Sequence, residues 1–212
     1  MTYLKTLIKE FFILEKKELP SWLLSTTKNN NNAVLRSYLW TSQFCHKIRL
    51  CELEIENKFY AESLVIYPDF CYETPIFGTE YLTIGKRKYF GAIDFHPITE
   101  SQNFMQFLEM FPDRKVNKTI FYNFDSFFSK KLWLKRRNED FYDEYQIMVK
   151  CFLHQYKKCL LKSQKSNASF KKQQNQYNKY MLLNDPAFGV LKSYFNEDFA
   201  ENYLHNFLFS NK

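Results

Sequence analysis

The carboxyl group of Glu80 is the first candidate for chemistry in this sequence. Glu80 closes the mostly apolar run Pro75-Ile76-Phe77-Gly78-Thr79-Glu80. Such surroundings raise the pKa of a carboxyl group, so that it can hold a transferable proton near neutral pH. A salt bridge on the face of a strand is the alternative interpretation, and the residues alone leave both open.

Asp185 carries a second carboxyl group of interest, in the motif Asn184-Asp185-Pro186. An aspartate ahead of a proline and an apolar helical segment is typical of an N-cap, whose side chain accepts a hydrogen bond from a backbone N–H group. From these residues alone, capping is the favoured role.

The motifs indicate neither a metal site nor a nucleotide site. His46, His154 and His205 have no partner at ligand spacing, and the five cysteines lack the close pairs of a zinc site. The chain also has no phosphate-binding glycine loop. We therefore expect no metal, no tightly bound cofactor, and reduced, mostly structural thiols.

The composition favours one compact domain over residues 1–212, because 45 % hydrophobic and 19 % aromatic residues can bury a substantial core. No apolar run approaches membrane-spanning length, and Glu10, Glu15 and Glu18 argue against an N-terminal targeting peptide. We expect a soluble monomer. The formal charge of +7 suits a nucleic acid or an acidic protein partner, but the dispersed basic residues argue against nucleic acid.

Hydrophobic periodicity predicts the elements that must position these groups. An amphipathic helix is expected over residues 2–17. Alternating apolar residues then predict strands, which we place at 34–41, 46–56, 59–67, 75–84 and 87–95. The short connections Asn57-Lys58 and Gly85-Lys86 imply antiparallel neighbours.

The second half of the chain has helical periodicity. Helices are predicted at 104–111, 139–163, 174–183, 187–195 and 197–208. Asn138 and Asn196 are expected to cap the second and the last of these helices. Strands followed by helices predict an α+β fold, a three-layer sandwich with a central antiparallel sheet flanked by helices.

Four segments resemble the ferredoxin-dependent bilin reductases, namely 67–80, 91–97, 184–186 and 202–209. This resemblance implies an oxidoreductase that reduces an open-chain tetrapyrrole, biliverdin or dihydrobiliverdin, without metal or flavin. Electrons would arrive singly from a reduced 2Fe–2S ferredoxin, in a radical mechanism, and the protein would supply the protons.

The resemblance implies that Glu80 and Asp185 are the catalytic acids of a bilin pocket. The family has an aspartate at the position of Glu80, so this chain keeps the acid and lengthens it by a methylene. Some relatives have a pocket histidine or asparagine at the position of Ser63, and another has a glutamate at that of Cys51. Because serine cannot shuttle protons as histidine does, both departures argue against the relative that makes phycocyanobilin directly.

Three further residues are candidates for contact with the substrate, beside Ser63. Arg136 resembles the family arginine that binds a propionate of the bilin, although Arg137 leaves the register open by one residue. Asp94 and His96 lie at a predicted strand end. We expect them to be mainly structural, with substrate contact as the alternative.

Residues 37–40, 48–49 and 67–70 look most like the family member that converts biliverdin to 15,16-dihydrobiliverdin. The sister enzyme that reduces the A-ring diene of this product to phycoerythrobilin shares the acids and is an alternative. A non-catalytic bilin carrier and a basic nucleic-acid module are alternatives outside the enzyme class.

The expected partners are ferredoxin, the bilin and the next bilin reductase, to which product would pass. Part of the ferredoxin surface is expected at Lys86, Arg87, Lys88, Lys130 and Lys131, with solvated loop charges as the alternative. The expected location is the plastid stroma, for a plastid-encoded or mature chain, or the cytoplasm of a cyanobacterium or phage host.

Overall fold

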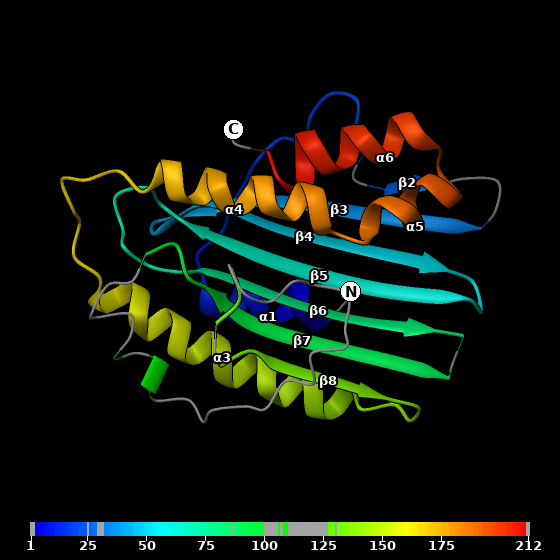
Figure 1. Ribbon diagram of the computed structural model, residues 1–212, viewed down its shortest axis with the longest axis horizontal. Helices are drawn as coiled ribbons and strands as arrows, with labels where there is room; N and C mark the ends of the chain where they lie inside the picture. The colour runs from blue at the N-terminus through cyan, green and yellow to red at the C-terminus, as the bar shows by residue number, and fades with distance from the viewer. Residues whose placement is uncertain are drawn as a thin grey trace.

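The computed structural model describes residues 3–24, 26–28, 32–85, 87–99, 106, 108–109, 127–129 and 131–210. Within these residues an eight-stranded antiparallel sheet has helices on both faces (Figure 1). The predicted α+β sandwich with a central antiparallel sheet is therefore confirmed.

Five long strands form the middle of the sheet, in chain order. They are β3 (Ala33–Ser42), β4 (Cys45–Ile55), β5 (Phe59–Pro68), β6 (Ile76–Ile84) and β7 (Lys88–His96). Each agrees with its predicted range to within one residue at either end, and each pairs antiparallel with the next. The turn residues Asn57 and Gly85 have φ of 57° and 59°, which suits the tight connections predicted there.

Three short edge strands were not predicted. They are β1 (Glu15–Lys16), β2 (Thr26–Lys28) and β8 (Trp133–Arg137). The pairing of β1 with β3 corrects the predicted first helix, because α1 (Tyr3–Phe11) ends well before residue 17. β8 is rich in lysine and arginine, and its strand conformation comes from pairing with β7 rather than from its own alternation.

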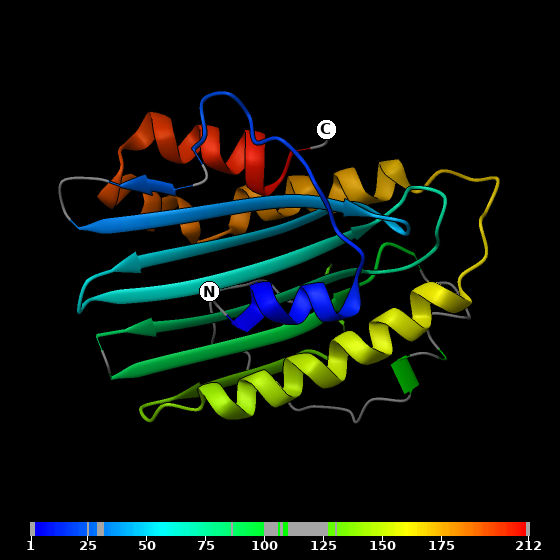
Figure 2. The ribbon, with the colours of Figure 1, turned by 180° about the vertical axis from the view of Figure 1, so that it is seen from behind.

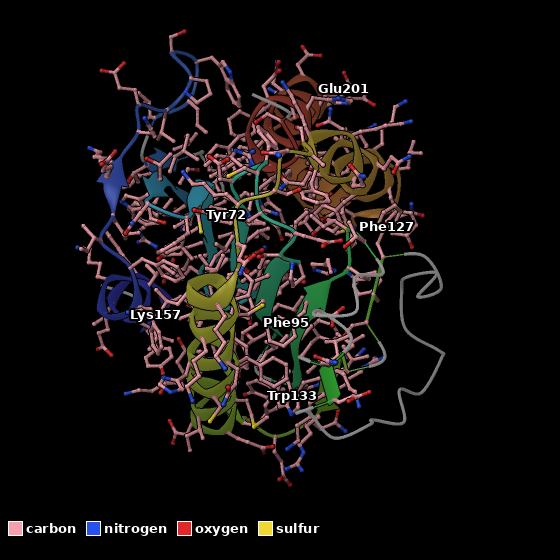
Figure 3. All side chains as sticks on the ribbon, turned by 90° about the vertical axis from the view of Figure 1, so that its left-hand side faces the viewer. Tyr72, Phe95, Phe127, Trp133, Lys157 and Glu201 are labelled. Atoms are coloured by element: carbon pink, nitrogen blue, oxygen red, sulfur yellow. The ribbon has the colours of Figure 1, made fainter. Side chains whose placement is uncertain are left out.

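One face of the sheet is covered by α1 and by α3 (Tyr142–Lys162), as the view from behind shows (Figure 2). Figure 3 shows Phe95 of β7 and Trp133 of β8 beside α3. Phe95 stacks on Phe152 of α3, with ring centroids 5.3 Å apart. The predicted cap at Asn138 is wrong. α3 begins later, and the Tyr142 N–H group donates to Asp140 Oδ1 at 2.9 Å.

The other face is covered by the C-terminal elements (Figure 1). They are α4 (Lys171–Asn184), α5 (Ala187–Tyr194), α6 (Glu197–Tyr203) and the π-helical turn η1 (Leu204–Leu208). The predicted cap at Asn196 is confirmed, because its Oδ1 accepts a hydrogen bond from the Phe199 N–H group at 2.8 Å. α4 starts three residues before its predicted range, and the predicted helix at 104–111 lies largely outside the described residues.

Neither a membrane span nor a metal cluster is found in the described part of the chain. None of its helices is long and apolar enough to cross a bilayer. None of its groups of His, Cys, Asp and Glu has the three members needed to hold a metal ion.

Candidate active site

Two adjoining cavities lie between the sheet and the C-terminal helices. The larger has a volume of about 350 Å³ and the smaller about 70 Å³. The walls of the larger are mainly aliphatic and aromatic, with residues from β3 to β8 below and from α5, α6 and η1 above. Four residues line both cavities: Arg49, Ser63, Glu80 and Asp185. The polar groups therefore lie where the two cavities meet.

Strand register brings three of the pocket residues into one row. Cys51 on β4 lies opposite Ser63 on β5, and Ser63 lies opposite Glu80 on β6. Directly opposed residues in an antiparallel sheet point to the same face. The same row continues to Ala92 on β7, whose small side chain leaves space beside Glu80.

Glu80 is a half-buried acid without an ion pair among the described residues, so the strand-face salt bridge is not seen there. Burial raises the pKa of Glu80 to about 8, with a further contribution from the negative charge of Asp185. Arg49 opposes this shift. Glu80 is thus mostly protonated at pH 7 and can donate a proton.

Asp185 makes a local backbone hydrogen bond and also lines the cavities, although the N-cap residue of α5 is Pro186 rather than Asp185. It lies between α4 and α5, and its Oδ1 accepts a hydrogen bond from the Ala187 N–H group at 2.8 Å, which stabilises the first turn of α5. The same carboxyl group lines both cavities. Burial raises the pKa of Asp185, while the Ala187 N–H group and Arg49 act in the opposite direction.

Arg49 is a site residue that the sequence analysis did not select. It lies on β4, two residues before Cys51 and therefore on the same face, and is only 3 % exposed. The sequence does contain a pattern that could have identified Arg49, because Lys47 and Arg49 alternate with the apolar Ile48 and Leu50. With one face of β4 buried against α1 and α3, this alternation sends both cations towards the other helical layer.

Asp94 and His96 hold the segment 127–129 against β7. Asp94 accepts hydrogen bonds from the N–H group and the hydroxyl of Ser129, and His96 Nδ1 lies 2.9 Å from the Phe127 carbonyl oxygen. Because burial lowers the pKa of His96 to about 4, the ring is neutral at pH 7, and Nδ1 donates to this carbonyl. Both side chains also line the smaller cavity.

The two remaining predicted substrate-binding residues, Ser63 and Arg136, differ in their exposure to solvent. Ser63 is half-buried beside Glu80, and its hydroxyl can donate and accept hydrogen bonds. Arg136 is exposed at the rim of the larger cavity, opposite Phe90 of β7. The neighbouring Arg137 does not line this cavity, so the structure favours Arg136 as the rim guanidinium.

Comparison with known proteins identifies the class of this fold and site. The family model for ferredoxin-dependent bilin reductases matches residues 1–210. The chain therefore belongs to the ferredoxin-dependent bilin reductases and is an oxidoreductase, as the motifs implied.

Individual relatives agree with this family. The chain is 27 % identical to 15,16-dihydrobiliverdin:ferredoxin oxidoreductase of Nostoc punctiforme, over 98 % of this chain and 93 % of the relative. It is 26 % identical to the protein of the same name from Prochlorococcus marinus strain MIT 9211, over 90 % and 87 %. The crystal structure of phytochromobilin synthase from tomato in complex with biliverdin shares the fold, with a TM-score of 0.81 at 16 % identity over 98 % of this chain and 82 % of that one.

Proposed function

We propose that this protein reduces biliverdin IXα to 15,16-dihydrobiliverdin, with two electrons from reduced ferredoxin and two protons. The observation that carries the proposal is the meeting of the two cavities at Glu80, Asp185, Arg49 and Ser63. An elongated, conjugated substrate that occupies both cavities passes over these polar groups. The names of the curated relatives support the same reaction.

In the proposed reaction, the electrons and the protons come from different donors. Each reduced ferredoxin gives up one electron, so two ferredoxins are oxidised for each bilin reduced. A protonated carboxyl group supplies a proton to the reduced chromophore, and we assign this role to Glu80 and Asp185. The mainly aliphatic and aromatic walls limit the access of bulk water to the reactive intermediate.

The remaining candidates are assigned to binding. The exposed Arg136 guanidinium suits a propionate of the bilin, because it can form two parallel hydrogen bonds with a carboxylate. Ser63 is assigned a hydrogen bond to the substrate beside Glu80. Asp94 and His96 line the smaller cavity and are assigned its shape, with any contact limited to the end of the substrate.

The test is an anaerobic assay in which the purified protein is mixed with biliverdin and a ferredoxin reducing system. We expect a biliverdin complex of about 1:1 stoichiometry, as for one pocket, and then 15,16-dihydrobiliverdin as the product in chromatography. Turnover of dihydrobiliverdin but not of biliverdin would assign the protein to the next reductase of the pathway. A bound spectrum unchanged by reduced ferredoxin would instead indicate a bilin carrier.

A further inference from the structure

The guanidinium of Arg49 is a buried charge that forms no ion pair with the described residues. Its Nη1 donates to Cys51 Sγ at 3.9 Å, and its Nε has no hydrogen-bond acceptor among those residues. The Phe209 ring centroid, 5.2 Å from the guanidinium carbon, offers partial compensation through a cation–π contact. A buried cation in this state favours a ligand that carries or acquires negative charge.

The position of Arg49 shows where that negative charge would be. Arg49 lines both cavities, at their meeting point, together with Ser63 and the two candidate acids Glu80 and Asp185. The propionate proposed for the rim guanidinium of Arg136 lies away from this point, because Arg136 lines only the larger cavity. Arg49 is therefore placed beside the conjugated body of a substrate that spans both cavities, next to the two acids.

We infer that Arg49 is a catalytic residue that stabilises the negative charge which the bound bilin acquires with each electron, before a carboxyl group delivers the proton. This inference rests on the proposed function. In the first step reduced ferredoxin is oxidised and the bilin becomes a radical anion. Glu80 then gives its proton to the bilin, which becomes a neutral radical, and the carboxylate that remains is next to the same cation. A fixed charge of this kind needs no reorganisation during the reaction.

The identity of the cation suits this role. Lys47 lies two residues earlier on the same face of β4, and burial lowers the pKa of Lys47 to about 7. A lysine in such a site loses much of its charge near neutral pH, whereas a guanidinium stays charged in proteins. Arginine at position 49 therefore supplies a permanent charge where a lysine would not.

The first experiment compares the wild-type protein with Arg49→Gln and Arg49→Lys. Each is loaded with biliverdin and given single electrons by a photoreduced chemical donor, and the radical is followed by absorbance and electron paramagnetic resonance. We expect Arg49→Gln to take up the first electron at least about 10-fold more slowly, at the low end of the effect of one preorganised donor. Arg49→Lys should recover part of the rate. Lys158→Gln, on the exposed side of α3, is the matched control for loss of one positive charge.

A second pair of variants keeps Arg49 in place, in case its removal prevents folding. Because Cys51 Sγ lies 3.9 Å from Nη1, Cys51→Asp would place a carboxylate against the guanidinium and neutralise it. Cys51→Asn has the same shape without the charge. We expect the Asp variant to take up the first electron at least about 10-fold more slowly than the Asn variant, as for a preorganised charge that has been cancelled.

The outcomes separate this inference from the proposed function. Equal electron uptake in wild type and Arg49→Gln, or in Cys51→Asp and Cys51→Asn, would overturn the role of Arg49. Loss of biliverdin affinity in folded Arg49→Gln, with a normal electron rate in the complex that still forms, would make Arg49 a binding residue only. If wild type takes electrons from the chemical donor but not from ferredoxin, the proposed function fails while the variant comparison still decides the role of Arg49. Absence of biliverdin binding by wild type would overturn both.

Discussion

At the scale of single residues, Glu80 and Asp185 are two carboxyl groups in different environments. Both are half-buried beside Arg49, but only Asp185 accepts a backbone hydrogen bond, from the Ala187 N–H group, among the described residues. That bond favours the ionised form of Asp185, whereas the burial of Glu80 and its proximity to Asp185 favour the neutral form. The difference makes Glu80 the better proton donor in the resting protein.

Amide variants test this assignment. Glu80→Gln and Asp185→Asn keep the shape of the side chain and remove the transferable proton, so both should bind biliverdin and then stall, with a long-lived radical. We expect turnover to fall by about 10²-fold or more, the range for a lost general acid. The measurement is single-turnover absorbance with reduced ferredoxin, and Glu201→Gln on the exposed surface of α6 is the control. Near-normal rates in both amide variants would leave Glu80 and Asp185 with structural roles.

The pH dependence of turnover follows from the ionisation of Glu80. The donor is the acid form, and burial raises the pKa of Glu80 to about 8, so the donor is present at pH 7 and is lost as the pH rises through 8. Turnover should therefore be nearly constant below pH 7 and fall about tenfold per pH unit well above 8, as for one ionising acid. Biliverdin affinity, measured separately at each pH, distinguishes this loss from weaker binding. A profile that persists unchanged in Glu80→Gln would assign the ionisation to another group.

At the scale of elements, the close approach of the His96 side chain on β7 to Gly78 on the neighbouring strand β6 shapes the smaller cavity. Gly78 on β6 lines this cavity, and a Cβ atom there would lie 2.5 Å from His96 Nε2. The His96 ring has little freedom to move, because Nδ1 donates to the Phe127 carbonyl oxygen. Glycine at position 78 therefore permits the approach of this ring.

The variant Gly78→Ala tests this packing. We expect a loss of about 1–3 kcal/mol in the free energy of unfolding, typical of overpacking in a core. Gly189→Ala is the matched control, because Gly189 lies in α5 and a Cβ atom there would meet no described neighbour within 4 Å. That change should instead stabilise the protein by up to about 1 kcal/mol, through helix propensity. Denaturant titration measures both, and equal stability of the two variants would contradict the packing argument.

At the scale of the whole molecule, the formal charge of +7 suits an acidic redox partner. Four basic residues are exposed near the rim of the larger cavity, two on or beside the β6–β7 turn and two at the end of β8: Arg87, Lys88, Arg136 and Arg137. Lys86 and Lys130 of the predicted ferredoxin surface lie outside the described residues, and Lys131 is half-buried. The ferredoxin surface is thus proposed at this rim.

Charge reversal tests the proposed surface. Arg87 and Arg137 are exposed and do not line the cavity, so Arg87→Glu with Arg137→Glu should leave biliverdin affinity unchanged. Ferredoxin-driven turnover should slow by about 10-fold at low salt and by less at high salt, because ions screen long-range attraction. Lys158→Glu, near the C-terminal end of α3, is the control for reversal of an exposed charge elsewhere. A rate that does not respond to salt in wild type or variant would locate ferredoxin docking elsewhere.

The sequence alone determined the regular part of this protein. Apolar residues and turn signals located the five central strands to within one residue, because consecutive strands are antiparallel neighbours whose pairing starts at the turns. The Asn196 cap depends only on residues within one turn, so it too could be predicted. Glu80 and Asp185 were selected because their motifs resemble those of the bilin reductases, and the fold brings both to one pair of cavities.

Only the tertiary structure decided the edge strands, the end of α1 and the composition of the pocket, because these features depend on contacts between residues distant in the chain. The cationic strand β8 forms because β7 offers an unpaired edge, and α1 ends early because residues 15–16 pair with β3. The bond from Asp185 to the start of α5 is local, but no local pattern could establish that the same side chain lines the pocket. Arg49 becomes a buried charge at the meeting point of two cavities only when helices cover that face of β4, since burial, unlike alternation, is a property of the assembled layers.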